Sequence, residues 1–488
     1  MFGKSARRAL LAGTLFLAVN AGVAHAAQCS DSAGSGGDWP LYGHDLSNTR
    51  VQTAEDKIST STVSGLKFVW SSAGSSGTST AVIQGRCVYM TGADGMVRAL
   101  DIETGAQVWE APTTLLGSDE AAVLYALSVD NGRVYVNSTY SDNARMLAFD
   151  ANTGARIWTS NPLSFGGPRI EGVTPAQPFD GMVYEGGNGP DADPTARPGY
   201  QILDAASGET LHAQTVIPKK DLDAGYAGGG TWAAPAVDED EHYLYEGTAN
   251  PYSKKVESRY DDAIIKIDVD PTRPTFGTVV DSFKGEPDSL GLNRTPVCDN
   301  GDNVPAYHPS GFSTACAQLD IDFAAAPNLW HNKAGELMVG ELQKDGIYHA
   351  LYAKNMSSAW NQVVGGPQIY TGGNSVSSAY DGKYIYTVGN GGLLSALDPE
   401  TGRFMWNMES AFNTYSPIAV ANGVVFNSDT HTLWAHNAAD GTPLWATSLG
   451  VDSGKVCGTG LTSGGVSIAH HTVIANCDGT LTAYRLPS

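Results

Sequence analysis

DIETGAQVW, from Asp101 to Trp109, is one of four copies of a pattern that decides the fold. The other three copies are DANTGARIW from Asp150 to Trp158, DPETGRFMW from Asp398 to Trp406 and NAADGTPLW from Asn437 to Trp445. In each copy an Asp or Asn caps a tight turn, and a Gly supplies a position with positive φ. The apolar stretch after the Gly then pairs with the strand before the turn. The terminal Trp would pack at the outer edge of this hairpin against its neighbour.

Weaker copies of the pattern extend the count to eight. DAASGETLH runs from Asp204 to His212, a degenerate copy lies near Phe283, and two further tails end at Trp70 and Trp360. The interval from Trp70 to Trp109 is about the length of one four-stranded propeller blade. The sequence therefore predicts an all-β fold, an eight-bladed β-propeller of four-stranded antiparallel blades.

The two ends of the chain complete each other in this scheme. The last expected strand, Leu481 to Tyr484, has no tail after it, and the tail that ends at Trp70 has no complete blade before it. We expect both to belong to one blade, because a closed ring leaves no free sheet edge.

Composition narrows the class of protein further. The chain has 57 Gly among 488 residues, only 16% charged residues and a net charge of −22. This excludes a disordered chain, a coiled coil and a collagen-like fibre. An acidic chain also repels phosphate backbones, so we expect no nucleic-acid partner.

Residues 1–27 have the features of a signal peptide. Lys4, Arg7 and Arg8 precede an apolar run, and Ala24-His25-Ala26 forms a cleavage signal. No later run is apolar enough to span a membrane. We expect a single propeller domain over residues 28–488, in the periplasm or secreted.

All six cysteines follow this cleavage signal, which predicts three disulfides in an oxidising compartment. Several connectivities are open. Pairing of near neighbours would give Cys298–Cys316 and Cys457–Cys477, leaving Cys29–Cys87. No CxxC or CxxCH occurs, which argues against a cysteine-ligated zinc site and a covalent c-type haem.

The tails, together with DWPLYGHDLSNTR from Asp38 to Arg50, resemble the pyrroloquinoline quinone (PQQ) alcohol dehydrogenases. The likeness covers nearly the whole expected mature chain and is greatest to the soluble, polyvinyl-alcohol-dehydrogenase-like branch without a haem domain. Cofactor-free assembly propellers share such tails, so a non-enzymatic assembly or binding scaffold is the alternative.

Three internal segments are more specific. GGGTWAAPAVDEDEHYLYEGTANPYS, Gly228 to Ser253, resembles the family segment whose Trp forms the floor under PQQ. Trp232 stands at that position, where an indole face can stack on a flat quinone. Asn250 matches the family's amide ligand to Ca²⁺, an ion that takes six to eight oxygen ligands.

LDIDFAAAPNLW, Leu319 to Trp330, resembles the segment that carries the catalytic Asp directly before an aromatic residue. Asp322 before Phe323 fits this placement and would be both the base and a metal ligand. Asp320 is the alternative base. In that register Asp322 would take the place of the additional acidic ligand of lanthanide-using relatives, so the choice between Ca²⁺ and a lanthanide stays open.

ELQKDGIYHAL, Glu341 to Leu351, resembles the segment whose basic residue reaches the quinone carbonyl, and Lys344 stands there. VYEGGNGPD, Val183 to Asp191, is similar to the stretch with the family's Glu ligand to Ca²⁺, here replaced by Asp191. Thr174 stands where the family often has a hydroxyl contact to PQQ. The adjacent Cys-Cys pair of many members is absent.

The resemblance implies oxidation of a small-molecule or polymeric alcohol. Ca²⁺ would polarise a PQQ carbonyl, and Asp322 would accept the hydroxyl proton. Since the haem domain is missing, electrons would pass to a separate acceptor such as a cytochrome c. No G-x-G-x-x-G, H-E-x-x-H or G-x-S-x-G motif favours a nicotinamide enzyme or a hydrolase.

Overall fold

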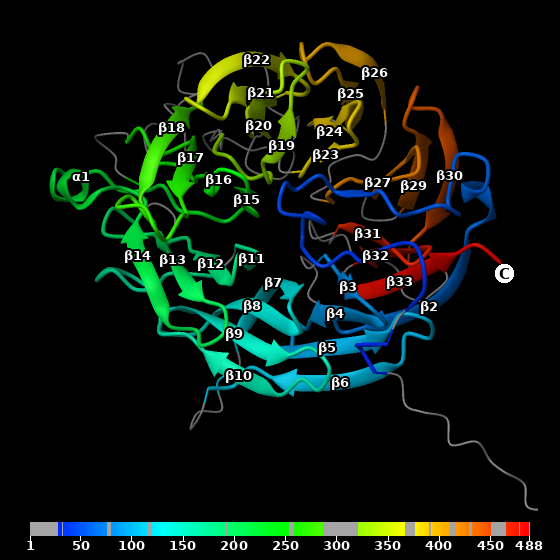
Figure 1. Cartoon of the computed structure of the whole chain (residues 1–488), viewed down its shortest axis with the longest axis horizontal. Coiled ribbons are helices and arrows are strands. Elements are labelled where there is room, and N and C mark those ends of the chain that lie inside the picture. Colours follow the sequence, from blue (N-terminus) through cyan, green and yellow to red (C-terminus); the bar gives the residue numbers. More distant parts are fainter. Residues whose placement is uncertain are drawn as a thin grey trace, which may run out of the picture.

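The computed structural model describes residues 28–487 apart from 32, 76–79, 116–119, 121, 173, 191–192, 253–257, 286–320, 367–375, 390–391, 410–415, 429–431, 450–464 and 478. The sheets are arranged in a ring around a central axis (Figure 1). There are eight of them, which confirms the predicted eight-bladed β-propeller.

Each of the first four blades is an antiparallel meander of four strands taken in chain order. Blades 1 and 2 consist of β3 (Val82–Gln84), β4 (Cys87–Thr91), β5 (Met96–Asp101), β6 (Gln107–Pro112), β7 (Val123–Asp130), β8 (Arg133–Thr139), β9 (Ala144–Asp150) and β10 (Arg156–Thr159). Blades 3 and 4 consist of β11 (Gln177–Phe179), β12 (Met182–Gly186), β13 (Gly199–Asp204), β14 (Thr210–Thr215), β15 (Ala236–Asp238), β16 (Tyr243–Gly247), β17 (Ala263–Asp268) and β18 (Val279–Lys284).

Blades 5 and 6 repeat this order, and blades 7 and 8 include strands from the N-terminal region. Blades 5 and 6 consist of β19 (Asn328–His331), β20 (Leu337–Leu342), β21 (Ile347–Tyr352), β22 (Ser357–Val363), β23 (Ala379–Tyr380), β24 (Ile385–Gly389), β25 (Leu393–Leu397) and β26 (Phe404–Glu409). Blades 7 and 8 consist of β1 (Val51–Gln52), β27 (Ala419–Ala421), β28 (Val424–Ser428), β29 (Thr432–Asn437), β30 (Pro443–Ser448), β31 (Val466–Ala469), β32 (Thr472–Cys477), β33 (Thr480–Arg485) and β2 (Lys67–Ala73).

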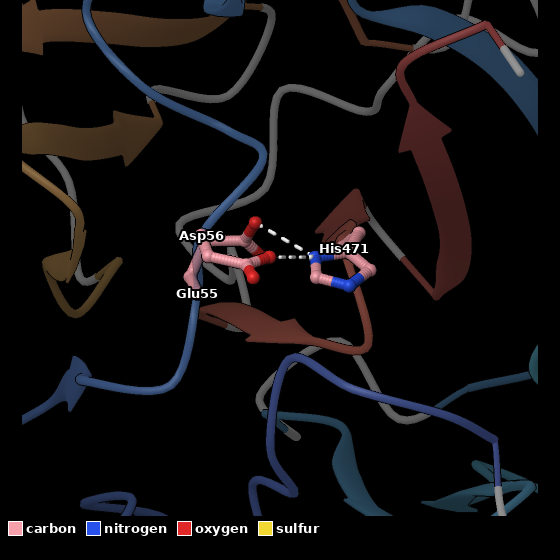
Figure 2. Close-up of side chains that lie close together, drawn as sticks. All are labelled: Glu55, Asp56 and His471. Carbon is pink, nitrogen blue, oxygen red and sulfur yellow. Dashed lines mark hydrogen bonds and ion pairs between the residues drawn. The ribbon is translucent and has the colours of Figure 1, made fainter.

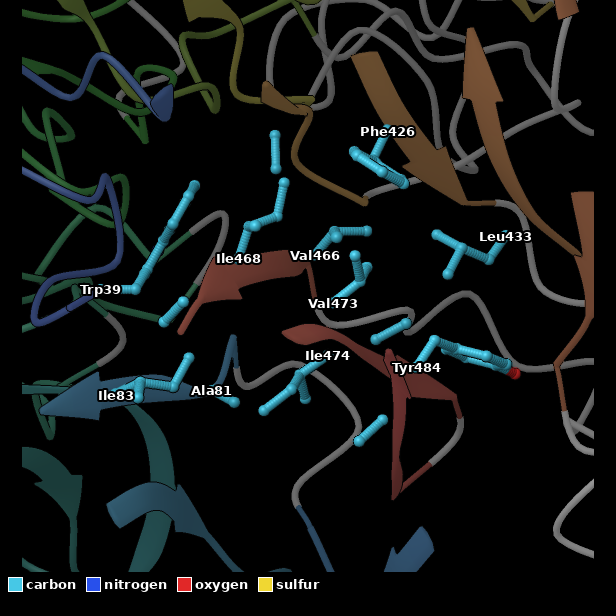
Figure 3. Packing of buried hydrophobic residues seen from close by; sticks show 14 of the residues in the cluster. Trp39, Ala81, Ile83, Phe426, Leu433, Val466, Ile468, Val473, Ile474 and Tyr484 are labelled. Carbon is cyan, nitrogen blue, oxygen red and sulfur yellow. The ribbon is translucent and has the colours of Figure 1, made fainter. Parts of the chain in front are cut away.

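The ring closes as the sequence predicts, in blade 8. Strand β2 pairs antiparallel with β33, so that Trp70 lies opposite Ala483. One detail was not expected: β1 adds to blade 7 as a fifth, parallel strand beside β27. A continuous apolar core joins blades 1, 7 and 8, with Trp39, Ile83, Phe426, Ile468 and Tyr484 packed together (Figure 3).

The repeated tails connect neighbouring blades through their Trp and Gly residues. The indole nitrogen of Trp109 donates to the carbonyl of Ala151 in the next blade, 2.9 Å away. A Cβ at Gly154 would lie 2.5 Å from the Trp109 ring, and this Gly has φ +70°. A Gly is therefore required at position 154 for two reasons: the turn needs a positive φ, and the Trp109 ring leaves no room for a Cβ.

Little else interrupts the strands. The described helices are α1 (Lys219–Asp223) and the 3₁₀ turn η1 (Val63–Gly65). Among the described residues, neither helix has the length and apolar character to cross a membrane. A disulfide joins Cys29 to Cys87, which confirms that pair. The proposed pairs Cys298–Cys316 and Cys457–Cys477, and the predicted signal peptide, lie outside the residues whose side chains the structure describes.

Strand alternation decides which loops meet. In an antiparallel blade, the connection between the second and third strands and the connection leaving the fourth strand lie at the same end of the ring. Trp232 follows β14 and Asp322 follows β18, while Asn250 follows β16 and Lys344 follows β20. The topology thus brings all four to one end of the propeller.

Candidate active site

Three of the predicted site residues form one contact group. The Nζ of Lys344 lies 2.6 Å from a carboxylate oxygen of Asp322, and both side chains are almost fully buried. The same ammonium lies 4.4 Å from the centre of the Trp232 ring, a cation–π distance. The pairing compensates for the burial of both charges. Residues separated by up to 112 positions therefore combine an aromatic face, a cation and a carboxylate.

Short backbone contacts hold these loops together. Thr231 bridges to Thr248, so the Trp232 loop lies beside the loop of Asn250. The amide of Phe323 donates to the carbonyl of Thr248 over 3.2 Å, and the amide of Lys344 donates to the carbonyl of Asp322 over 3.1 Å. The segment around Asp322 is thus inserted between the loops of blades 4 and 5.

Thr174 lies against the same assembly from the side of blade 3. A Cβ at Gly186 would be 2.7 Å from the Thr174 hydroxyl and 2.4 Å from that of Thr231. Because Gly186 has no side chain, the hydroxyls of Thr174 and Thr231 can both lie close to its backbone. The carbonyl of Thr174 is fixed by the side-chain amide of Asn137, 3.1 Å away. Asp191 and Asp320 lie outside the described residues.

Several polar atoms at these positions lack a partner. Within the described part of the chain, the Thr174 hydroxyl, the Trp232 indole nitrogen and the Asn250 side-chain nitrogen are buried and accept or donate no hydrogen bond. Buried polar groups are normally hydrogen-bonded, so these atoms in the loops around the ion pair are available to a ligand. An indole face, an ammonium and these polar atoms fit a flat, carbonyl-bearing, anionic molecule such as PQQ.

The structure adds buried acids that the sequence reasoning missed. Glu246 and Glu341 are completely buried, on β16 and β20. The Glu341 carboxylate lies over Gly247, where a Cβ would be 2.3 Å from its oxygen and 2.6 Å from the Cβ of Phe323. A Glu within an apolar strand, as in the Tyr-Glu-Gly sequences at 184–186 and 245–247, was the available signal.

Burial shifts these acids toward their protonated forms. It raises the pKa of Glu246 well above its usual value, against the hydrogen bond that Tyr184 donates. Burial also raises the pKa of Glu341, and the charges of Glu246 and Asp322 add to this effect. Glu185 on β12 has its pKa raised to about 8 by burial. In all three side chains burial therefore favours the neutral carboxylic acid over the carboxylate.

One group of three metal-ligating side chains occurs among the described residues, at a different place. Figure 2 shows Glu55, Asp56 and His471, whose ligand atoms lie within 4.8 Å of one another. The His471 Nδ1 lies 2.9 Å from Glu55, and its Nε2 lies 2.9 Å from the Ser35 hydroxyl. Hydrogen bonds thus account for both ring nitrogens, and this group joins the N-terminal segment to blade 8.

Of the predicted calcium ligands, Asn250 and Asp322 are described and offer oxygen atoms, which Ca²⁺ prefers.

Comparison with known proteins identifies a repeat family and several relatives. The profile of the PQQ_2 repeat family, described as outer membrane protein assembly factor BamB, matches residues 50–174 and 329–488. Polyvinylalcohol dehydrogenase of Sphingopyxis sp. (strain 113P3) is 26% identical over 484 residues, which covers 87% of this chain and 70% of that protein. Quinohemoprotein alcohol dehydrogenase of Comamonas testosteroni is 27% identical over 263 residues, 45% of this chain and 35% of the relative.

The other curated relatives are aligned over less than half of their own length. Among solved structures, the crystal structure of the Comamonas testosteroni quinohemoprotein alcohol dehydrogenase superposes with a TM-score of 0.68 at 17% identity. It covers 92% of this chain and 82% of the other. At this identity the likeness concerns the fold.

Proposed function

The chain belongs to the PQQ_2 repeat family, and we propose that it is a PQQ-dependent dehydrogenase that oxidises an alcohol to an aldehyde or ketone. The observation that carries the proposal is the contact group of Trp232, Lys344 and Asp322. A propeller that only binds other proteins has no need of a buried ion pair over an indole face, surrounded by unsatisfied polar atoms. The names of the relatives support the same activity.

Each residue has a distinct part in this proposal. When bound, PQQ supplies a carbonyl that accepts hydride from the alcohol, and a cation beside it makes that carbonyl more electrophilic. Trp232 holds the flat ring system by its face. Lys344 places positive charge where the carbonyl oxygen gains negative charge. Asp322 takes the hydroxyl proton onto its carboxylate.

The buried acids favour Asp322 as the base. Burial raises the pKa of Glu246 and of Glu341 and so favours their protonated forms, which leaves less carboxylate to accept a proton. Asp322, in contrast, is paired with an ammonium at 2.6 Å. Asp320 stays the alternative base. Thr174 is proposed to contact PQQ, and Asn250, Asp322 and Asp191 to provide oxygen ligands to Ca²⁺.

The proposal also covers the substrate, the electron acceptor and the location of the protein. We propose a small-molecule or polymeric alcohol as the substrate. The electrons would leave to a separate acceptor, and relatives named as cytochrome c enzymes support a cytochrome. Residues 1–27 would be removed as a signal peptide, leaving residues 28–488 as one domain in the periplasm or outside the cell.

The test starts from purified protein freed of metal with a chelator. PQQ is added with Ca²⁺, with a lanthanide, or without metal, and dye-linked oxidation of short alcohols and of polyvinyl alcohol is measured. We expect quinone absorbance to remain with the protein, and turnover to need both PQQ and metal. Full activity in the stripped protein would contradict the metal assignment. Failure to bind PQQ under all conditions would favour the scaffold function instead.

A further inference from the structure

Gln343 connects the two charged residues of the site through its side chain. It directly precedes Lys344 in the turn after β20 and is completely buried. Its Nε2 donates to the carbonyl of Ile321 over 2.7 Å, and Ile321 directly precedes Asp322. The side chain of Gln343, which is next to Lys344, is thus hydrogen-bonded to the backbone of Ile321, which is next to Asp322.

His349 on β21 determines how this amide is oriented. Its Nε2 lies 3.0 Å from the Gln343 Oε1. Burial lowers the pKa of His349 to about 4, so the ring is neutral near pH 7. An amide oxygen only accepts, so the Nε2 of His349 must carry the proton and donate it. The Gln343 NH₂ group is then directed to the Ile321 carbonyl, and tautomer and amide orientation fix each other.

The surroundings leave this pair little freedom. The His349 ring packs on Phe323 and Phe283, with ring centres 5.7 Å and 5.2 Å away. A Cβ at Gly285 would lie 2.6 Å from both the Gln343 Oε1 and the Phe323 ring. A backbone bridge also joins Phe323 to Gln343. The residues before and after Asp322, Ile321 and Phe323, are therefore both bonded to Gln343 in the turn that carries Lys344.

We propose that Gln343 and His349 are positioning residues, which fix where the Asp322 carboxylate and the Lys344 ammonium lie relative to the Trp232 face. This rests on the proposed function, because Asp322 and Lys344 carry the chemistry there. Neither positioning residue touches the reacting atoms. Their loss should leave the aromatic floor and its affinity for PQQ in place, while the carboxylate and ammonium lose their fixed separation.

The first measurement needs no cofactor. In ¹⁵N NMR spectra of the imidazole nitrogens of the protein without PQQ, His349 should be neutral and protonated at Nε2 from pH 6 to 8. Gln343→Leu should abolish this preference. A His349 protonated at Nδ1, or one that becomes a cation as the pH falls from 8 to 6, would overturn the proposal.

The second measurement uses the protein loaded with PQQ and metal. Gln343→Leu and His349→Leu should lower kcat about 10- to 100-fold, the usual effect of losing a group that orients a functional side chain. The PQQ dissociation constant and KM should change much less. His349→Gln, whose amide can donate from the place of Nε2, should restore most of kcat. Gln362→Leu on β22 is the matched control and should behave as wild type.

The two kinds of failure are separable. If the wild-type protein binds no PQQ, the proposed function fails, while the NMR result still reports on the hydrogen-bond chain. If the wild-type protein is active and Gln343→Leu keeps its kcat, the positioning role is wrong. A parallel loss of kcat and PQQ affinity, not restored by His349→Gln, would also contradict it, because a general structural defect acts on both.

Discussion

Blade 8 and the loops of blades 3 to 5 both contain buried polar and charged side chains, but the partners of these side chains differ between the two regions. At blade 8, His470 lies 2.8 Å from Asp38 and His471 lies 2.9 Å from Glu55, so the N-terminal segment is tied to the end of the chain. In the loops of blades 3 to 5, Thr174, Trp232 and Asn250 present buried atoms without a partner in the described chain. The first region pairs its two histidines with carboxylates of the same chain, whereas the second leaves buried donors and a buried hydroxyl at the site that we propose binds PQQ.

This contrast is expected where one part of a protein maintains the fold and another performs a function. Unsatisfied polar groups lower stability, and they are retained where a ligand uses them. Substitutions in blade 8 should therefore mainly change stability, and substitutions in the loops of blades 3 to 5 should mainly change binding and turnover. Four experiments test this separation.

Asp322→Asn should have the largest effect. Loss of a general base lowers the rate by about 10²–10⁴-fold. The Asn side chain keeps an oxygen for Lys344, so PQQ should still bind, but thermal stability should fall because the buried ammonium loses its counter-charge. Measurement of kcat together with PQQ retention checks this. Asp320→Asn is the control for the alternative base, and if it alone removes turnover, Asp320 is the base.

Ile468→Ala should have the next largest effect, and on stability. Ile468 is fully buried in the core that closes the ring (Figure 3). Truncation of a buried Ile to Ala typically lowers the free energy of unfolding by about 2–5 kcal/mol. Denaturant unfolding measures this change, and kcat of the folded fraction should be unaltered. A variant as stable as wild type would show that ring closure does not depend on this core.

Trp232→Ala should weaken PQQ binding by about tenfold or more, because the stacking face is lost. Trp232→Phe keeps an aromatic face and removes the unsatisfied indole N–H, so the melting temperature without PQQ should not fall. Absorbance titration and thermal melts measure the two quantities. A lower melting temperature for the Phe variant would mean that Trp232 is a structural core residue.

His470 should give the smallest effect, a pH dependence of stability. Burial alone would lower the pKa of His470, but the hydrogen bond and charge of Asp38 outweigh it, and the pKa is raised. This stabilisation is therefore complete below the pKa of the unfolded state, about 6.5, and is lost as the pH rises through the folded pKa. We expect about 0.2–1 kcal/mol. Unfolding free energies from pH 5 to 9 should depend less on pH in His470→Gln.

Much of the fold could be predicted because its signals are local. The Asp or Asn and the Gly of the four clear tails specify a turn within nine residues, and the Trp packs on the Gly of the next copy, as Trp109 does on Gly154. The resemblance likewise selected Trp232, Lys344 and Asp322, and the structure brings these together. The parallel addition of β1 to blade 7 has no such local signal and was missed.

The sequence by itself determined the number of blades, their order and the closure of the ring, because strand periodicity and turn chemistry act over a few neighbouring residues. Only the tertiary structure revealed the buried acids Glu246 and Glu341 and the chain from His349 through Gln343 to the segment of Asp322. Burial, pKa and hydrogen-bond orientation depend on groups that neighbouring blades bring together from distant parts of the chain. The spacing of residues in the sequence does not indicate which distant residues lie close together in the fold.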